Sequence, residues 1–69
     1  MTKQELIRDL KKETGSSFVT ISGIARYMGM GRDTVRNEIT AGLEYIESGR
    51  SKSYFVGDIA QRIIERRRA

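Results

Sequence analysis

The sequence predicts a small single domain, residues 1–69, that is mainly α-helical and carries one β-hairpin. Three observations predict this class. Apolar residues recur at three- and four-residue spacing in several segments, which is the period of amphipathic helices. Glycines and residues that cap helices separate these segments. Towards the C-terminus, two aromatic or β-branched runs flank a polar turn with a glycine, which indicates a hairpin.

The first element expected is a support helix within residues 1–15. Thr2 and Glu5 have the spacing of a capping box, in which each side chain accepts a hydrogen bond from the other residue's backbone. Gly15 ends the helix, because a glycine takes the left-handed conformation at little cost. One face is apolar and consists of Leu6, Ile7 and Leu10.

The next two elements form a helix-turn-helix. Thr20 caps a helix in which Ile24 and Met28, four residues apart, lie on the same face. Ala25 is small enough for a second helix to cross closely. Gly29 ends the first helix in the left-handed conformation and redirects the chain into the turn.

The second helix of this motif completes a predicted helix-turn-helix over residues 20–41. Val35 and Ile39 give it a buried stripe, and Gly31 is its N-cap without a side-chain acceptor. The remaining polar side chains are expected to face outward, where they can reach base edges in the major groove of DNA. These are Arg32, Asp33, Arg36, Asn37 and Thr40.

Each polar residue of this helix has an expected role in DNA binding. Arg36 suits a guanine edge and Asn37 an adenine edge, while Arg32 serves bases or phosphate. Asp33 accepts from a cytosine amine or complements the positive end of its helix. Thr34 packs or binds a phosphate. Two base-reading side chains on one helix indicate sequence-specific binding.

A β-hairpin is predicted over residues 43–56, with strand residues Leu43, Tyr45 and Ile46 before the turn and Tyr54, Phe55 and Val56 after it. Small donors and cations occupy its tip, and such a set suits a phosphate backbone or a minor groove. A hairpin in this place after a helix-turn-helix is called a wing. The tip residues are Ser48, Arg50, Ser51, Lys52 and Ser53.

A C-terminal helix is predicted over residues 58–68, capped by Asp58 with Gln61. Its buried stripe is Ile59, Ala60, Ile63 and Ile64. The net charge of +4 arises entirely after residue 47, where six basic residues face two acidic ones. A basic excess on one segment favours a polyanion partner. Further contacts to the DNA backbone are expected from Arg26, Arg66 and Arg67.

Composition argues against other classes of function. The chain contains no Cys and no His, so thiolate metal sites and the commonest general base are lacking. We expect no enzyme activity, no catalytic residue, and no metal, cofactor or small-molecule ligand. The sequence contains no apolar run of the roughly 20 residues that a membrane span needs and no signal-peptide core. A cytoplasmic protein that associates with the nucleoid of a bacterial or phage-infected cell is expected.

The order of these features resembles the winged-helix domains of the excisionase and MerR-like superfamily, from about Val19 to Arg66. The residues that carry the resemblance are the helix-turn-helix, Ala41-Gly42-Leu43, Tyr45, the Gly-Arg-Ser-Lys wing, Tyr54-Phe55-Val56 and Asp58-Ile59-Ala60. The resemblance implies double-stranded DNA binding, with Arg32, Asp33, Arg36 and Asn37 in the major groove and Arg50 and Lys52 as wing contacts. It also implies a recombination directionality factor of a phage or mobile element. Its partners would be an integrase and further copies of itself.

Other roles stay open at this point. The same domain fits a small transcriptional repressor or a phage packaging adaptor. A protein-interaction module is a further alternative, because Asp33, Glu38, Glu44 and Glu47 lower the positive charge of the DNA-facing surface. For an enzyme, only residues 29–31 resemble a phosphate loop, and they lack its lysine.

Overall fold

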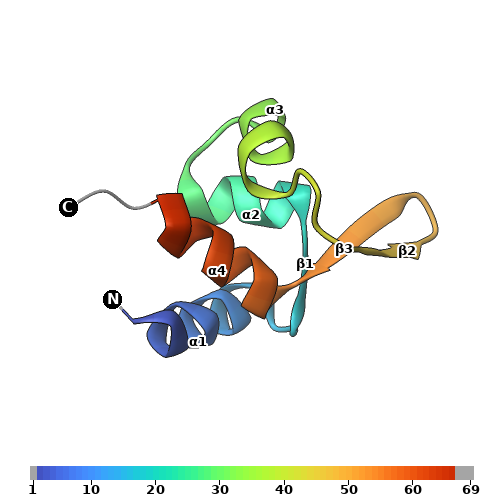
Figure 1. The fold of residues 1–69 in the computed structure, drawn as a ribbon. Coiled ribbons are helices and arrows are strands. Elements are labelled where there is room, and N and C mark those ends of the chain that lie inside the picture. The colour runs from blue at the N-terminus through green and yellow to red at the C-terminus, as the bar shows by residue number, and fades with distance from the viewer. Residues whose placement is uncertain (1, 67–69) are drawn as a thin grey trace.

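A computed structural model describes residues 2–66 and shows an α-rich domain with a three-stranded antiparallel sheet (Figure 1). The elements in chain order are α1 (Lys3–Thr14), β1 (Phe18–Thr20), α2 (Ile21–Met28), α3 (Arg32–Thr34), the π-helical turn η1 (Val35–Ile39), β2 (Ile46–Ser48), β3 (Ser51–Phe55) and α4 (Val56–Arg66). The β2–β3 hairpin projects to one side of the helical body. The expected mainly α-helical class with a hairpin is confirmed, and the sheet gains a third strand.

Helix α1 begins and ends as the sequence predicts. The Thr2 N–H donates to Glu5 Oε1 over 2.9 Å, and the Glu5 N–H donates to Thr2 Oγ1 over 3.2 Å. The first of these bonds is the main reason why the pKa of the Glu5 carboxyl lies below its ordinary value. Gly15 has φ +72° and donates its N–H to the Lys11 carbonyl. The capping box and the glycine stop are both confirmed.

The turn between α2 and α3 also follows the prediction. The Thr20 hydroxyl accepts from the Gly23 N–H over 3.1 Å and so caps α2. Gly29 ends α2 with φ +68°, and the next N–H, that of Met30, donates to the Ala25 carbonyl over 3.0 Å. These local bonds fix the direction in which the chain enters α3.

The second helix of the motif is not a regular α-helix, because its last turn is π-helical. The Thr40 N–H donates to the Val35 carbonyl over 3.0 Å, which is a bond across five residues. Thr40 was expected to face outward, and this is wrong, since it is buried. In an α-helix Thr40 would lie about 140° around the axis from Val35. A turn that takes up one more residue brings it back to the buried face, where its hydroxyl donates to the Arg36 carbonyl.

The sheet has the order β1–β3–β2, so residues 18–20, expected only to lead into α2, form a strand against β3. The first hairpin strand begins at Ile46 and not at Leu43. Leu43 instead packs half-buried against the core and donates its N–H to the Thr40 carbonyl. A two-residue turn joins the strands, with Gly49 at φ +64° and Arg50 following.

Helix α4 begins at Val56, directly after β3, so the predicted cap at Asp58 is wrong. The Val56 N–H donates to the Ser17 carbonyl over 2.9 Å, which replaces a side-chain cap. Asp58 lies in the first turn, where its charge complements the positive end of the helix. Gln61 bonds to Glu65 rather than back to the start of the helix.

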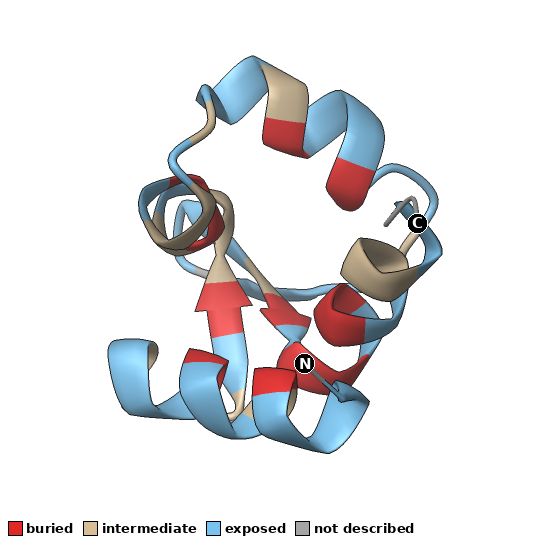
Figure 2. Cartoon of the chain, turned by 90° about the vertical axis from the view of Figure 1, so that its left-hand side faces the viewer, coloured by how far each residue is buried: buried red, intermediate tan, exposed pale blue. Residues whose placement is uncertain are grey.

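The core lies between the helices and the inner face of the sheet. Figure 2 shows that the buried positions of the helices and of the sheet face one another inside the domain. The largest fully buried side chains are Leu10, Val19, Ile24, Val35, Ile39, Val56 and Ile59. The apolar stripes predicted for the helices therefore form one core. Within residues 2–66, no helix has the length and apolar character that crossing a membrane requires.

Candidate nucleic-acid interface

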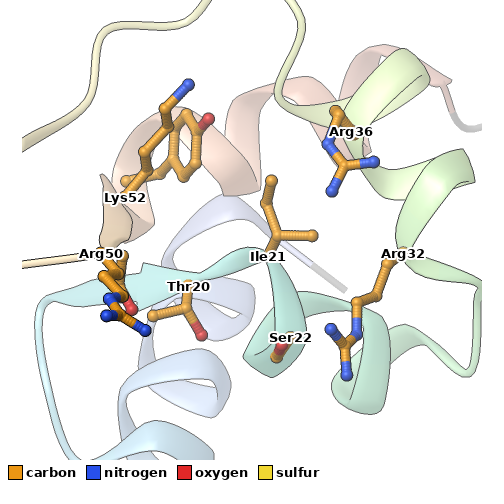
Figure 3. Close-up of a pocket in the computed structure, with 9 residues that line it drawn as sticks. Thr20, Ile21, Ser22, Arg32, Arg36, Arg50 and Lys52 are labelled. Carbon is orange, nitrogen blue, oxygen red and sulfur yellow. The ribbon is translucent and has the colours of Figure 1, made fainter. Parts of the chain in front are cut away.

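A groove with four cations runs between α3–η1 and the β2–β3 hairpin (Figure 3). We call it the cationic groove. Its lining residues are Thr20, Ile21, Ser22, Arg32, Arg36, Arg50, Ser51, Lys52 and Tyr54. None of the described residues that line it is acidic. The site therefore has the charge and the open shape that suit a polyanion.

The cations come from two separate parts of the chain. Arg32 and Arg36 are four residues apart on α3–η1, so they lie on the same face of this segment. Arg50 occupies the hairpin turn and Lys52 lies on β3. Figure 3 shows the two arginines of α3–η1 on one side of the groove and the two hairpin cations on the other. The fold thus brings together two basic pairs that are distant in the sequence.

An exposed ion pair holds Arg36. Its Nη1 lies 2.8 Å from Asp33 Oδ1, one helical turn earlier. The Asp33 side chain is 91% exposed, so water screens the pair and its contribution to stability is small. The contact does restrict the rotamers of the Arg36 guanidinium beside the groove. Asp33 therefore contacts the proposed base reader, a role that the sequence did not indicate.

Two tyrosines position Lys52. Its Nζ lies 4.6 Å from the centroid of the Tyr45 ring, and the Tyr45 and Tyr54 rings are tilted against each other with centroids 5.9 Å apart. A cation over an aromatic face is attracted by the ring quadrupole. Tyr54 is nearly buried and fixes this stack to the core. Tyr54 thus belongs to the core and Tyr45 to its exposed rim, where it places Lys52.

The floor of the groove is the start of α2, which was not among the predicted site residues. Thr20, Ile21 and Ser22 lie between the two basic pairs (Figure 3). The predicted Thr20 cap was the available signal, because it marks the start of a helix, where the first backbone N–H groups have no partner within the helix. A phosphate that enters the groove would meet this positive helix end.

Comparisons with known protein families, curated proteins and solved structures find no match. The chemistry of the groove is therefore the basis on which its function is inferred. It offers cations and small polar groups from α3–η1, from the start of α2 and from the hairpin. Its described titratable groups are arginine, lysine and tyrosine side chains.

The other predicted site residues divide into several groups. Ser51 lines the groove. Asn37 is exposed on η1 and Thr34 is half-buried, and neither lines it. Ser53 was expected with the wing contacts, but it lines a hollow with Phe55 on the face of the sheet opposite Lys52 and Tyr54, because side chains alternate along β3. Ser51 departs from this alternation at the start of the strand, next to the turn. The strand bounds place Ser48 at the end of β2, and its side chain lies outside the described part of the chain.

The three arginines that were predicted to contact the DNA backbone differ in where they lie. Arg26 is exposed and lines a neighbouring hollow that shares Thr20 and Ser22 with the groove. Arg66 does not line the groove, because its Nη2 lies 2.6 Å from Glu38 Oε1 on η1. Arg67 lies outside the described residues.

Helix α4 supports the segment that carries the arginines. Arg62 donates to the Ala41 carbonyl over 2.9 Å, and Arg66 pairs with Glu38. Both contacts join α4 to the C-terminal end of η1 and the residues that follow it. Two basic residues of the last helix thus act on the groove through the helix that they support.

Helix α2 is fixed from its other side by a hydrogen bond from the Tyr27 hydroxyl to the Asp9 carboxylate on α1. Burial, and then this bond, raise the pKa of the Tyr27 phenol to about 12. The phenol is therefore neutral and donates at physiological pH.

Proposed function

We propose that this chain is a winged helix-turn-helix protein that binds double-stranded DNA. In this proposal α3–η1 enters the major groove, and the β2–β3 hairpin is the wing that lies on the backbone or in the adjacent minor groove. The observation that carries the proposal is the placement of Arg32 and Arg36 opposite Arg50 and Lys52, in a groove whose described lining is free of acidic residues.

The two sides of the groove suit different parts of the duplex. Arg36 and Asn37 are exposed on η1 and carry the side chains that pair bidentately with guanine and adenine edges. Arg50 and Lys52 lie on a narrow projecting hairpin, which suits contacts to phosphates. The hairpin then supplies affinity for any duplex, while η1 supplies preference for a sequence.

A titration with fluorescently labelled random-sequence duplex at low salt tests the proposal. We expect binding at micromolar protein, since non-specific affinities in this range are typical of basic DNA-binding domains. Selection of tight binders from a random duplex pool should then yield a consensus site. Failure to bind the random duplex at micromolar protein would contradict the proposal and favour the alternative in which this face binds a protein.

For the biological role we propose, on the resemblance, a recombination directionality factor that acts with an integrase in a bacterial or phage-infected cell. A domain this small covers little DNA, so several copies on adjacent sites are expected. Bending of the selected site, measured by circular permutation of its position in a fragment, tests this role. Cooperative binding with a bend supports it, whereas a single non-bending site favours the repressor alternative.

A further inference from the structure

The large exposed apolar side chains of the described residues gather at one place. Phe18, Tyr45, Ile46 and Phe55 are between 40% and 53% exposed, and all four line a single hollow. We call it the apolar hollow. Its other lining residues are Glu44, Ser53 and Asp58. Contiguous apolar surface of this kind marks interaction sites more often than scattered apolar residues do.

The apolar hollow and the cationic groove lie on opposite faces of the sheet. Along β3, Ser53 and Phe55 point to the hollow, while Lys52 and Tyr54 line the groove. Phe18 and Ile46, the strand partners of Phe55 and Ser53, also line the hollow. Thr20, the partner of Ser53 on β1, lines the groove at the point where β1 leads into α2, and Tyr45 lies at the border, because its ring contacts Lys52 and Tyr54. A duplex in the groove therefore leaves the hollow accessible.

The aromatic floor of the hollow is held in place. The Phe18 and Phe55 rings lie 5.8 Å apart between centroids in a tilted arrangement. The Phe55 ring also lies against Gly57 in the first turn of α4, where an added Cβ would lie 2.5 Å from Phe55 Cε2. Glycine is unfavourable in a helix, but here it makes room for the ring. The exposed phenylalanine is thus fixed by its surroundings and does not lie loose on the surface.

The charge of the hollow restricts what it can bind. Glu44 and Asp58 are its charged residues, and none of the described residues that line it is basic. Carboxylates repel phosphates, so this face does not suit DNA. They also repel their own copies in a symmetric dimer that would bury two hollows against each other. The remaining complementary occupant combines apolar side chains with positive charge.

We propose that the apolar hollow docks a segment of a different protein that carries one or two large apolar side chains flanked by Lys or Arg. Within residues 2–66, β2 pairs with β3 alone, so the backbone groups on its outer edge remain available beside Ile46. An extended segment that adds to this edge places alternate side chains over the hollow. The chain then joins DNA on one face of its sheet to a basic protein segment on the other.

Selection of short peptides from a random library displayed on phage, with the full chain as target, tests the proposal. We expect the enriched peptides to combine large apolar residues with Lys or Arg. Ile46→Ser should weaken binding of an enriched synthetic peptide about tenfold or more, since a central apolar contact is lost. Replacing both Glu44 and Asp58 with Lys should reverse the selection towards acidic peptides.

The controls separate this proposal from DNA binding and from misfolding. Arg36→Ala should leave peptide affinity unchanged, and Ile46→Ser should keep the amide NMR spectrum and the duplex affinity of the original chain. Peptide binding in the presence of saturating duplex should also be retained. Absence of duplex binding by the original chain, together with the expected peptide selection, would contradict the proposed function alone.

Three results would overturn the proposal. The first is enrichment of peptides that bind equally well to the Ile46→Ser variant. The second is a selection without any enriched peptide, or one whose peptides compete with duplex. The third is sedimentation that shows a concentration-dependent dimer abolished by Ile46→Ser, which would make a second copy of the chain the occupant.

Discussion

Removal of the two hairpin cations should change how strongly DNA binding depends on salt. In the proposed complex, Arg50 and Lys52 each neutralise a phosphate, and the double substitution by alanine removes both charges. Neither side chain is buried. The described cation–π contact of Lys52 is with Tyr45, which is itself exposed. The substitution should therefore leave the fold intact and act on the complex alone.

The number of cations in the groove gives the magnitude. On a random duplex Arg36 meets no preferred base and is counted with the phosphate contacts, so four contacts make the logarithm of the binding constant fall with the logarithm of salt concentration with a slope of about −3.6. With two contacts the slope is about −1.8. An increase from about 50 to about 200 mM salt then weakens the original chain about 150-fold and the double variant about 12-fold.

Fluorescence anisotropy with a random duplex over this salt range measures both slopes. Lys11→Ala combined with Lys12→Ala is the matched control, because it removes the same net charge from exposed positions on α1, outside the groove. The control should keep the slope of the original chain. Equal slopes for all three proteins would refute the assignment of the hairpin to the phosphate backbone.

Three further outcomes are expected. Arg36→Ala should cost about 1 to 3 kcal/mol on the selected site and relax its sequence preference, and equal losses on selected and random duplex would contradict a base-reading role. Gly29→Ala should lower the free energy of unfolding in urea by about 1 kcal/mol, because a Cβ is strained at φ +68°, and an unchanged midpoint would show that the turn relaxes. Tyr27 has a pKa of about 12 in the folded chain, above its ordinary value of 10.0, so its contribution to stability is complete below pH 10 and is lost as pH rises towards 12. Urea denaturation at a series of pH values should show that Tyr27→Phe loses less stability than the original chain as pH rises. Identical pH profiles for the two proteins would contradict a contribution of the Tyr27 phenol.

The parts of the fold that were predicted correctly depend on residues close in sequence. The capping pair Thr2 and Glu5, the Thr20 cap and the left-handed Gly29 each act within four residues of their partners. Periodicity likewise located the buried stripes, such as Val35 with Ile39, because burial of a helix face repeats with the helix turn. Local chemistry of this kind is readable without knowledge of the rest of the chain.

The parts of the fold that were predicted wrongly depend on partners that are distant in the sequence or on an unusual turn. Residues 18–20 become a strand only because β3 pairs with them, and α4 begins early because the Ser17 carbonyl accepts from Val56. Burial of Thr40 follows from one hydrogen bond across five residues, which residue types do not reveal.

The sequence located the cations of the candidate site but not the surroundings of every predicted site residue. The cations Arg32, Arg36, Arg50 and Lys52 were named from the sequence, and the structure brings them together around one groove. Ser53 was expected with the wing contacts, whereas in the structure it lines the hollow that Phe55 also lines. Arg66 was assigned to DNA, but Glu38 engages it, and this contact depends on how α4 packs against η1.

The alternation of side chains along β3 has a consequence for any change in hairpin length. Inserting a single residue between Ser51 and Lys52 would exchange the faces of all strand positions on one side of the insertion relative to those on the other. If the positions after the insertion change faces, Lys52 joins the apolar hollow and Phe55 turns towards the groove at the same time. Changes of hairpin length that preserve both surfaces must therefore come in steps of two residues per strand, each of which extends the reach of the tip by about 6.6 Å. The distance that the hairpin spans along a ligand is thus adjustable only in discrete increments.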